Sequence, residues 1–450
     1  MEASSKIKRF MEPSSVALIG VPRRAGRASF NILETLLQIG FEGKVYPVNP
    51  SADSILGVKA YPEVKALPPG IELAVIMLSR EAVPGIVREC VEKDIKAIAV
   101  VSEGFAEADE RGKTLQDEIV RIATSHGVRI LGPNSLGVVN NFHRFTTTFL
   151  PFPRKQIEVA FITQSGGLFE GFADFTAGKA IDLGNMSDVE FADALEYFED
   201  DLDTKVIALH IEGIRNGRKF MKTARRVNEK KPILALKTGR SELGARATFS
   251  HTGSLTGSDA VYDAVFKQLG IIRVENVDEL GDITKALLHL PPLRGNKIGI
   301  ITPTGAGAAM VLDAMTKHGF ELAKLRNDTI EAIREYFPPW APPHNPIDMM
   351  AAAIAHEYKA VYQASLEALL KDPGIDAILC IAGFPTLKTI KNTVGAETKP
   401  VITWVLGNWG HDLLSRIEET RYRAVYPTPE RAVRALAALR ERSARQSNQN

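Results

Sequence analysis

One histidine of this sequence lies in a segment made almost entirely of glycine and hydroxyl-bearing residues. The segment runs from Ser250 to Asp259 and reads Ser-His-Thr-Gly-Ser-Leu-Thr-Gly-Ser-Asp. Such a composition cannot build a core, and it offers many backbone N–H groups to an anion. We therefore expect a loop that presents His251, before a helix capped by Ser258 or Asp259. On composition alone, a glycine-rich surface loop with an incidental histidine is an equal alternative.

A second group of residues with the chemistry of an anion site follows an apolar strand. The stretch Gln164-Ser-Gly-Gly-Leu168 is expected to open a helix, so that N–H groups of Ser165, Gly166 and Gly167 face a phosphate with the helix dipole behind them. An ordinary strand-to-helix turn carries the same short pattern. Glu212 ends another strand at the same expected edge, where a carboxylate could orient a histidine and stabilise its charged form. A solvated strand-end acid is the alternative for Glu212.

The elements that must position these residues are alternating apolar strands and helical stretches. This alternation is typical of parallel sheets covered on both faces. The first set of expected strands is Ser15–Gly20, Lys44–Val48, Leu73–Leu78, Ala97–Val101 and Arg129–Leu131. The second set is Val159–Thr163, Ala180–Leu183, Val206–Ile211, Pro232–Leu236 and Ile271–Val274, and a third begins at Ile298–Thr302 after the linker Pro291–Gly295. We predict α/β domains at residues 1–142, 152–290 and 295–440, with a polar, frayed tail at 441–450.

Length and composition agree with this division. The 450 residues suggest about three domains at roughly 150 residues each. Fifty-five basic and 54 acidic residues leave a net charge of +1, which disfavours nucleic acid or a membrane surface as a partner. Cys90 and Cys380 lie far apart in sequence, so neither a disulfide framework nor a cysteine metal site is expected. No signal peptide or membrane span is evident, and we predict a cytoplasmic protein.

The second and third strand sets look like two copies of one unit. Three pairs of segments match in order: Val159–Gly166 with Ile298–Gly305, Ala208–Gly213 with Ile378–Gly383, and Lys231–Gly239 with Lys399–Gly407. Glu212 then corresponds to Ala382, and the His251 segment has no counterpart after Gly407. The first copy is therefore the expected location of an active site.

Together, these segments resemble the α subunits of the ADP-forming acyl-CoA synthetases, the archaeal acetyl-CoA synthetase type, which are related to succinyl-CoA synthetase. The resemblance covers nearly the whole chain. The matching stretches are Phe41–Pro50, Leu131–Gly137, Phe161–Gly166, Gly184–Val189, Ile211–Gly213 and Ser250–Gly257. The resemblance implies a Rossmann-like CoA-binding domain followed by two flavodoxin-like, succinyl-CoA-ligase-type domains.

The resemblance also implies a reaction and the residues that perform it. In that family an acyl-CoA reacts with phosphate to give an acyl phosphate, and the phosphoryl group then moves to a histidine and on to ADP. His251 matches this histidine, Glu212 matches the acid that holds it, and Ser165 with Gly166 and Gly167 matches the phosphate cradle. A neutral imidazole is a competent nucleophile near pH 7.

The resemblance further implies a partner. Three α/β domains leave no room for an ATP-grasp domain, so ATP or ADP and Mg²⁺ are expected mainly on a separate ATP-grasp β subunit, in an αβ or α2β2 heteromer. No HExxH or paired-cysteine spacing predicts a metal site in this chain. The small carboxylic acid substrate, the choice between ADP and GDP, and the direction of the reaction stay open.

The first domain departs from the family's usual turn after its first strand. Val21 and Pro22 replace small or hydroxyl residues, and the full G-x-G-x-x-G fingerprint is missing, which favours CoA over NAD. Paired arginines in this turn could contact CoA phosphates, and turns at two other strand ends could hold the pantetheine or adenosine. The expected cofactor-binding residues are Gly20, Arg23, Arg24, Gly26, Asn49, Pro50, Pro133 and Asn134.

A second departure is the stretch Leu168–Leu183, which is shorter than expected by roughly one to two helical turns. The acyl pocket is expected to differ accordingly. Phe169, Phe172, Phe175 and the run Thr146–Thr148 could line it, although aromatic residues at helical spacing are more often core. The segment Pro343–Asp348 is expected to serve subunit packing.

Two other functions stay open at this stage. One is a catalytically silent CoA-binding sensor or scaffold of the same fold, which the short stretch Leu168–Leu183 favours and the intact His251 and Glu212 oppose. The other is a nucleotide-dependent oxidoreductase, which only the Rossmann-like pattern of the first domain suggests.

Overall fold

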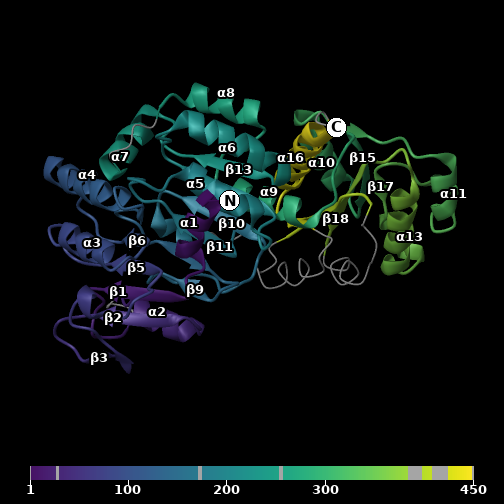
Figure 1. Cartoon of the computed structure of the whole chain (residues 1–450). Helices are drawn as coiled ribbons and strands as arrows, with labels where there is room; N and C mark the ends of the chain where they lie inside the picture. Colours follow the sequence, from purple (N-terminus) through teal and green to yellow (C-terminus); the bar gives the residue numbers. More distant parts are fainter. Residues whose placement is uncertain are drawn as a thin grey trace. The chain divides into compact units, whose positions relative to one another are not determined.

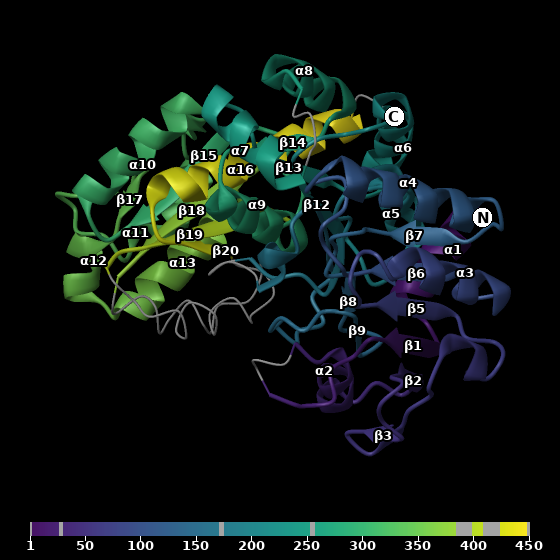
Figure 2. The same cartoon turned by 90° about the vertical axis from the view of Figure 1, so that its left-hand side faces the viewer.

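The computed structural model describes residues 2–26, 30–170, 175–252, 257–383, 398–407 and 424–447. The chain divides into two compact units, residues 1–280 and 281–450. Figures 1 and 2 show helices flanking the sheets of each unit. The α/β architecture predicted from the sequence is confirmed. The domain boundaries stay predictions.

A parallel sheet of five strands forms the N-terminal part of the first unit. Its order is β2-β1-β5-β6-β7. The strands are β1 (Ser15–Ile19), β2 (Lys44–Val48), β5 (Leu73–Ile76), β6 (Ala97–Val100) and β7 (Arg129–Leu131), each within two residues of its predicted bounds. The chain changes direction across the sheet between β1 and β5, so the crevice for a ligand is expected at the carboxyl ends of these strands.

Successive residues of β1 face two different cores. Val16 packs in a cluster with α1 and α2, and Ala17 packs in a cluster with α3 and α4. This alternation is what a fully buried strand requires. The helices are α1 (Glu2–Met11), α2 (Ile32–Ile39), α3 (Val83–Glu92) and α4 (Glu110–Thr124). The small elements β3 (Ser54–Ile55), β4 (Val58–Lys59) and η2 (Val64–Ala66) lie between β2 and β5 in sequence.

A second sheet completes the first unit, in the order β14-β13-β12-β10-β11-β8-β9. The predicted strands are β10 (Val159–Thr163), β11 (Lys179–Asp182), β12 (Val206–Ile211), β13 (Ile233–Lys237) and β14 (Ile272–Val274). The sequence did not predict β8 (Val138–Asn140) and β9 (Phe145–Thr146). They form an antiparallel hairpin, and β8 pairs with β11. Residues assigned to the end of the first domain thus belong to the second sheet.

The helices of this part are α5 (Phe191–Asp200), α6 (Gly217–Lys230), α7 (Glu242–Thr252) and α8 (Asp259–Leu269). As predicted, Ser258 is the N-cap residue of α8, although its side chain makes no capping hydrogen bond. Gly270 ends the helix in the left-handed region, at φ 78°.

The second unit is built on a third sheet, which has the strand order β16-β15-β18-β19-β20, with β17 beside β15. Its strands are β15 (Lys297–Thr302), β16 (Glu321–Leu322), β17 (Ile347–Asp348), β18 (Ala377–Ala382), β19 (Val401–Val405) and β20 (Ala424–Tyr426). Its helices are α10 (Gly305–Lys317), α11 (Asn327–Arg334), α12 (Met350–Ala355), α13 (Tyr358–Lys371) and α16 (Pro429–Ser447), and α9 (Val277–His289) begins in the first unit.

Strand order and two local contacts support the predicted duplication. The order β11-β10-β12-β13-β14 matches β16-β15-β18-β19-β20 strand for strand. Lys231 Nζ donates to the carbonyl oxygens of Phe198 and Asp201 at the end of α5, at 2.6 and 2.5 Å. Lys399 Nζ makes the same pair of contacts at the end of α13, with the carbonyl oxygens of Leu369 and Asp372. One lysine therefore binds a helix C-terminus in each copy.

The strand registers correct one detail of the predicted alignment. Val159 pairs with Val206 in the first copy, and Ile298 pairs with Ala377 in the second. Counting along both strands places Gly383, and not Ala382, at the position of Glu212. The alignment was one residue wrong because apolar strand residues are nearly interchangeable.

Two further segments of the second unit, the end of α16 and the stretch around Asn345, can be compared with the predictions made from the sequence. Helix α16 continues to Ser447 instead of fraying after Arg440. The Ser443 hydroxyl is buried there and accepts a hydrogen bond from the N–H of Leu293. In the segment predicted to serve subunit packing, Asn345 holds β15 in place by accepting from the N–H of Ile300 and donating to the carbonyl of Ile298.

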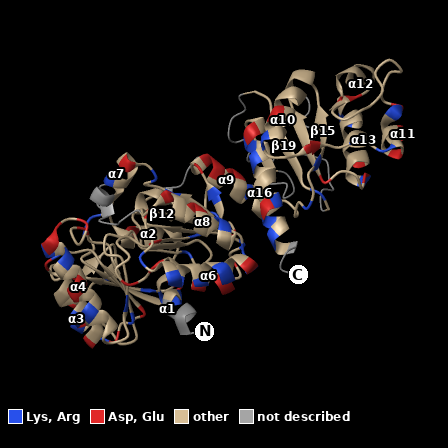
Figure 3. Cartoon of the chain, turned by 90° about the horizontal axis from the view of Figure 1, so that it is seen from above, with Lys and Arg blue, Asp and Glu red and all other residues tan. Residues whose placement is uncertain are grey.

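Charge is spread evenly over the described part of both units. Figure 3 shows acidic and basic residues interspersed on helices such as α4, α6 and α16. A net charge of +1 over 450 residues is consistent with this pattern. Any attraction of an anion must therefore come from local groups.

Candidate functional site

A cavity of about 560 Å³ lies where the carboxyl ends of the first two sheets meet. The first sheet contributes the loops Met77–Arg80, Val101–Glu103 and Asn134–Leu136, which follow β5, β6 and β7. The second contributes Gln164–Gly167 after β10 and Asp182 at the end of β11. Ligands of open α/β sheets bind at this edge. We call this space the junction cavity.

The turn after β10 is shaped by one threonine. The Thr163 hydroxyl accepts from the N–H of Ser165 at 3.0 Å and donates to the carbonyl of Ser165 at 3.1 Å. Gly166 follows, and a Cβ at this position would lie 2.4 Å from Leu136 Cγ and 2.7 Å from Asp182 Oδ2. Only glycine therefore fits at residue 166.

A helix does begin after this turn, but its described residues are not α-helical. Residues Gly166–Glu170 form a five-residue 3-10 helix, η3, instead of the start of an α-helix. Residues 171–174, which follow η3, lie outside the described residues. Phe169 and Phe175 are buried in the core, and Phe172 lies outside the described residues. An anion at Ser165, Gly166 and Gly167 would have to rely on local N–H groups.

Gln164 links this turn to the end of β12. Its Oε1 accepts from the N–H groups of Glu212 and Gly213, at 2.7 and 3.0 Å. Its Nε2 is buried and has no hydrogen-bond partner among the described residues. A buried amide that lacks a partner costs free energy, so this donor is suited to a ligand oxygen in the junction cavity.

Glu212 is buried next to a buried lysine. Lys237, the last residue of β13, donates from Nζ to the carbonyl of Glu212 at 2.9 Å and lies 4.8 Å from the ring centroid of Tyr262. Burial lowers the pKa of Lys237 to about 8. The Tyr262 hydroxyl accepts from the N–H of Ile214. Gln164 after β10, Lys237 at the end of β13 and Tyr262 of α8 therefore fix the backbone around Glu212.

The sequence analysis missed Asp182. Its Oδ2 accepts from the N–H of Leu136 at 2.7 Å and its Oδ1 from the N–H of Gly184 at 3.1 Å. Burial raises the pKa of Asp182 to about 7, the two N–H groups oppose this rise, and the charge of Glu212 adds to it. A titratable group thus lies in the wall of the junction cavity. Its place at the carboxyl end of a strand was a signal that could have found it.

His251 differs from the predicted loop position. It is the penultimate residue of α7, so the helix includes the first part of the glycine-rich segment. Its side chain lies outside the described residues, as do residues 253–256. The predicted neighbourhood of His251 and Glu212 therefore stays a prediction.

The expected cofactor-binding residues separate into three groups. Asn134 lines the junction cavity, and Gly26 lines a second cavity beside α2. Gly20 serves close packing, since its φ is +84° and a Cβ would lie 2.4 Å from the carbonyl oxygen of Met77. The remaining residues, Arg23, Arg24, Asn49, Pro50 and Pro133, line neither cavity.

The loop formed by the first of these residues is tied together locally. Arg23 is exposed and donates to the carbonyl of Ser51 at 3.4 Å, while Asn49 accepts from the N–H of Ser51. Both arginines are therefore exposed to solvent, and their contact with CoA phosphates stays a prediction.

Neither a metal-binding cluster nor a membrane-spanning helix occurs among the described residues. No group of three or more His, Cys, Asp or Glu side chains there is arranged to hold a metal ion. None of the helices among the described residues is long and apolar enough to cross a bilayer. Cys90 and Cys380 are both buried and form no disulfide.

Three family models match consecutive parts of the chain. They are a CoA binding domain at residues 14–141, a succinyl-CoA ligase like flavodoxin domain at 156–287 and a Ligase-CoA domain at 298–400. Fold and site therefore define a CoA ligase of the succinyl-CoA ligase type. The oxidoreductase alternative has no support, because its only basis was the segment that matches a CoA-binding domain.

Relatives cover the whole chain. This chain is 36% identical over 447 residues to the α subunit of ADP-forming acetate–CoA ligase II of Pyrococcus furiosus, and the match covers 96% of both chains. A solved structure, dinucleotide-forming acetyl-coenzyme A synthetase 1 of Ca. Korarchaeum cryptofilum with phosphate and ADP, has a TM-score of 0.87 at 34% identity, covering 98% of this chain and 97% of that one. This chain belongs to the family of the α subunits of ADP-forming acyl-CoA ligases.

Some relatives are longer than this chain. The chain is 39% identical over 376 residues to ADP-forming acetate–CoA ligase II of Archaeoglobus fulgidus, but the match covers only 56% of that protein. Relatives named as α subunits imply a second subunit. A partner subunit is therefore implied for this chain as well.

Proposed function

We propose that this chain binds an acyl-CoA at the junction cavity, exchanges CoA for phosphate, and passes the phosphoryl group through His251 to ADP on an ATP-grasp partner. The observation that carries this proposal is the junction cavity itself, where loops of the CoA-binding domain meet the Gln164–Gly167 turn of the flavodoxin-like domain. The net reaction converts acyl-CoA, ADP and phosphate to carboxylic acid, CoA and ATP, and it is reversible.

The first step is phosphorolysis of the thioester. A phosphate oxygen attacks the carbonyl carbon, the C–S bond breaks, and the CoA thiolate leaves and takes up a proton. In this step Gln164 Nε2 and the N–H groups near Ser165 and Gly166 supply fixed donors to developing negative charge. Fixed donors in a buried cavity stabilise such charge without reorganisation.

The second step moves the phosphoryl group. An imidazole nitrogen of His251 attacks the phosphorus of the acyl phosphate, the P–O bond to the acyl group breaks, and the carboxylate leaves. Glu212 is assigned to orient the imidazole and to stabilise its positive charge. The buried Lys237 and the Gln164 amide hold the backbone of Glu212 in place.

The nucleotide half of the reaction is assigned to the partner. ADP or ATP and Mg²⁺ would bind an ATP-grasp β subunit in an αβ or α2β2 assembly. A cytoplasmic location stays a prediction from the sequence. The acyl substrate is a carboxylic acid. The names of relatives range from acetate–CoA ligase to trans-feruloyl-CoA synthase, the latter 31% identical to this chain over 466 residues.

The proposal is tested by labelling with ATP. The chain, its partner and Mg²⁺ are incubated with γ-labelled ATP, and the α chain is examined for acid-labile, base-stable phosphate. We expect label on the wild type and none on His251→Ala. His126→Ala is the matched control because His126 is exposed in the turn between α4 and β7, and so precedes the amino end of that strand, whereas the junction cavity lies at the carboxyl ends. Label that persists in His251→Ala contradicts the phosphohistidine step.

A second experiment tests the role assigned to Glu212. Glu212→Gln should lower both labelling and turnover, because the neutral amide cannot stabilise a charged imidazole. CoA binding, measured by calorimetry, should be unchanged in both variants. A wild type that binds CoA but is never labelled would favour the sensor or scaffold function instead.

A further inference from the structure

His210 lies buried inside the second sheet, where its ring joins two strand ends. It belongs to β12, between β10 and β13, and only 4% of the residue is exposed. Its Nδ1 lies 3.1 Å from the hydroxyl of Thr163, the last residue of β10. Its Nε2 lies 3.1 Å from the hydroxyl of Thr238, which directly follows β13. One ring therefore links the ends of both neighbouring strands.

The hydroxyl of Thr163 fixes the tautomer of this ring. A hydroxyl donates one hydrogen bond and accepts two. Thr163 donates to the carbonyl of Ser165 and accepts from the N–H of the same residue, so the ring must donate to the second lone pair. Nδ1 then carries the hydrogen, and in a neutral ring Nε2 accepts from the hydroxyl of Thr238. These hydrogen bonds run in one direction, from Thr238 through His210 and Thr163 to the carbonyl of Ser165. We call them the imidazole chain.

The two ends of the imidazole chain belong to the two segments to which the proposed function assigns the phosphoryl group. Ser165 lies in the turn that lines the junction cavity. Thr238 is separated only by Gly239–Ser241 from the first residue of α7, the helix that contains His251. The imidazole chain therefore joins the turn assigned to phosphate to the base of the helix with the histidine assigned to phosphoryl transfer.

The second flavodoxin-like copy shows what the fold needs without this ring. Thr302 forms there the same turn that Thr163 forms in the first copy. The strand registers place Ile381 and Leu406 where the first copy has the histidine and its second threonine. Ile381 is buried in an apolar core. The turn and the strand ends thus form without an imidazole, so the needs of the fold do not account for His210.

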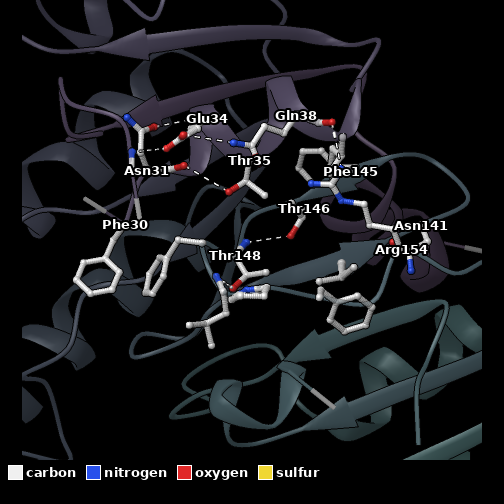
Figure 4. Close-up of a pocket in the computed structure, with 17 residues that line it drawn as sticks. Phe30, Asn31, Glu34, Thr35, Gln38, Asn141, Phe145, Thr146, Thr148 and Arg154 are labelled. Atoms are coloured by element: carbon white, nitrogen blue, oxygen red, sulfur yellow. Dashed lines mark hydrogen bonds between the residues drawn. The ribbon is translucent and has the colours of Figure 1, made fainter. Parts of the chain in front are cut away.

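Threonine hydroxyls that shape a turn contact residues close to them in sequence. In the segment that begins with β9, the Thr146 hydroxyl accepts from the N–H of Thr148 (Figure 4), and the Thr148 hydroxyl accepts from that of Leu150. Thr163 makes such a contact too, but its contact with the ring spans 47 residues of sequence, and that of Thr238 spans 28. Contacts of this second kind fix distant segments relative to one another.

We propose that His210 is a positioning residue that couples the turn after β10 to the start of the His251 helix through the imidazole chain. This inference rests on the proposed function for the roles of Ser165 and His251. The ring itself takes no part in bond making, because hydroxyls engage both of its nitrogens. Each end of the imidazole chain can therefore be released separately.

The two ring nitrogens can be replaced one at a time. The amide of His210→Asn reaches the place of Nδ1 and keeps a donor to Thr163, whereas the amide of His210→Gln reaches the place of Nε2 and keeps a contact with Thr238. In the complex with the partner, we expect His210→Asn to leave KM for phosphate within about twofold and to slow labelling of His251 by about fivefold. We expect the reverse for His210→Gln and both losses for His210→Leu.

A change at one end of the imidazole chain tests the same link without altering the histidine. Thr238→Val removes the donor to Nε2 and keeps the shape of the side chain, so its effects should match those of His210→Asn. Thr204→Val is the matched control because Thr204 is a buried threonine just before the amino end of β12, where its hydroxyl donates to Asp201. This control should change neither labelling nor KM. Thermal denaturation confirms that each variant is folded.

A spectrum tests the imidazole chain without turnover. In the full chain with isotope-labelled histidine, long-range proton–nitrogen correlation spectra should show His210 with its hydrogen on Nδ1. The signal is assigned by its loss in His210→Asn. A hydrogen on Nε2 and none on Nδ1 would overturn the imidazole chain.

Two results on activity overturn the positioning role. If His210→Asn and His210→Gln both behave like the wild type, or if both lose labelling and phosphate affinity equally, His210 does not couple two separate ends. A wild-type chain that is never labelled contradicts the proposed function instead, and the spectrum and the KM values for phosphate still decide the inference.

Discussion

Gln164 joins the two strand ends that matter most for the proposed chemistry. Its Oε1 binds two consecutive backbone N–H groups after β12, and this leaves its Nε2 buried and available to a ligand. The side chain before Ser165 thereby also sets the backbone of Glu212. The sequence showed both segments separately but not this link, because a glutamine in a turn has no spacing pattern that predicts its partner.

Asp182 gives a prediction about pH. Its pKa of about 7 means that it is mostly neutral at about pH 6 and mostly charged at about pH 8. A charged Asp182 repels phosphate, so KM for phosphate should rise with pH more steeply in the wild type than in Asp182→Asn. We expect the wild-type to variant ratio of KM to increase by about fivefold over this range, which corresponds to about 1 kcal/mol.

The ratio of the two KM values cancels the effect of phosphate ionisation, because this effect is the same for both proteins. Stability provides the second readout. A raised carboxyl pKa means that the folded state binds more protons than the unfolded state between about pH 4 and pH 7, so this group lowers stability as pH rises through that window. If the KM ratio is flat with pH, Asp182 does not face the phosphate.

At the scale of elements, the two flavodoxin-like copies share their framework and differ in their turns. Thr163 and Thr302 end corresponding strands and form the same turn, since Thr302 accepts from the N–H of Thr304 as Thr163 does from that of Ser165. The second copy continues into the helix α10, whereas the first begins with η3 and its residues 171–174 lie outside the described part of the chain. The duplication thus preserved the strand end and its turn.

The lysines that bind helix ends predict matched effects in the two copies. Lys231→Met and Lys399→Met should each lower the free energy of unfolding of their own unit by about 1.5 to 3 kcal/mol, because each removes a charged donor from two carbonyls. Denaturant unfolding followed by circular dichroism measures both. The control is Lys230→Met at the end of α6, because Lys230 is exposed and pairs with the side chains of Glu199 and Asp200 instead of with carbonyl oxygens.

A large loss of unfolding free energy in one of these two lysine variants and none in the other would contradict an equivalent role of Lys231 and Lys399. Equal losses smaller than those of Lys230→Met would show that the two contacts contribute little.

Most strands were predictable because each is a short apolar run bounded by turn residues, as β10 shows. The hairpin β8-β9 was not, because Val138–Asn140 and Phe145–Thr146 are too short for a period-two pattern to stand out. The α-helix after Ser165 was predicted from two glycines, of which Gly166 serves close packing against Leu136 and Asp182. Propensity describes a segment, whereas these outcomes depend on neighbours from distant parts of the chain.

For the whole molecule, the division into units 1–280 and 281–450 predicts two responses to ligand. All three tryptophans, Trp340, Trp404 and Trp409, belong to the second unit, so their fluorescence reports its unfolding alone. CoA at about 100 times its Kd should stabilise the first unit by about 2.7 kcal/mol. Far-UV circular dichroism should show a transition that shifts with CoA.

The tryptophan transition should stay in place when CoA is added. Adenosine at the same concentration is the control for non-specific effects. A tryptophan transition that moves together with the circular dichroism signal would mean that the two units unfold as one.

The β8-β9 hairpin limits where the chain can be divided into fragments. A fragment that ends at residue 142 would keep β8 without its partner strand, and a fragment that begins at residue 152 would leave β11 with an open edge. Open edges of this kind recruit other strands and cause aggregation. A cut is therefore better placed after α9, in residues 291–296, and any recombination with relatives should exchange the first two domains as a single cassette.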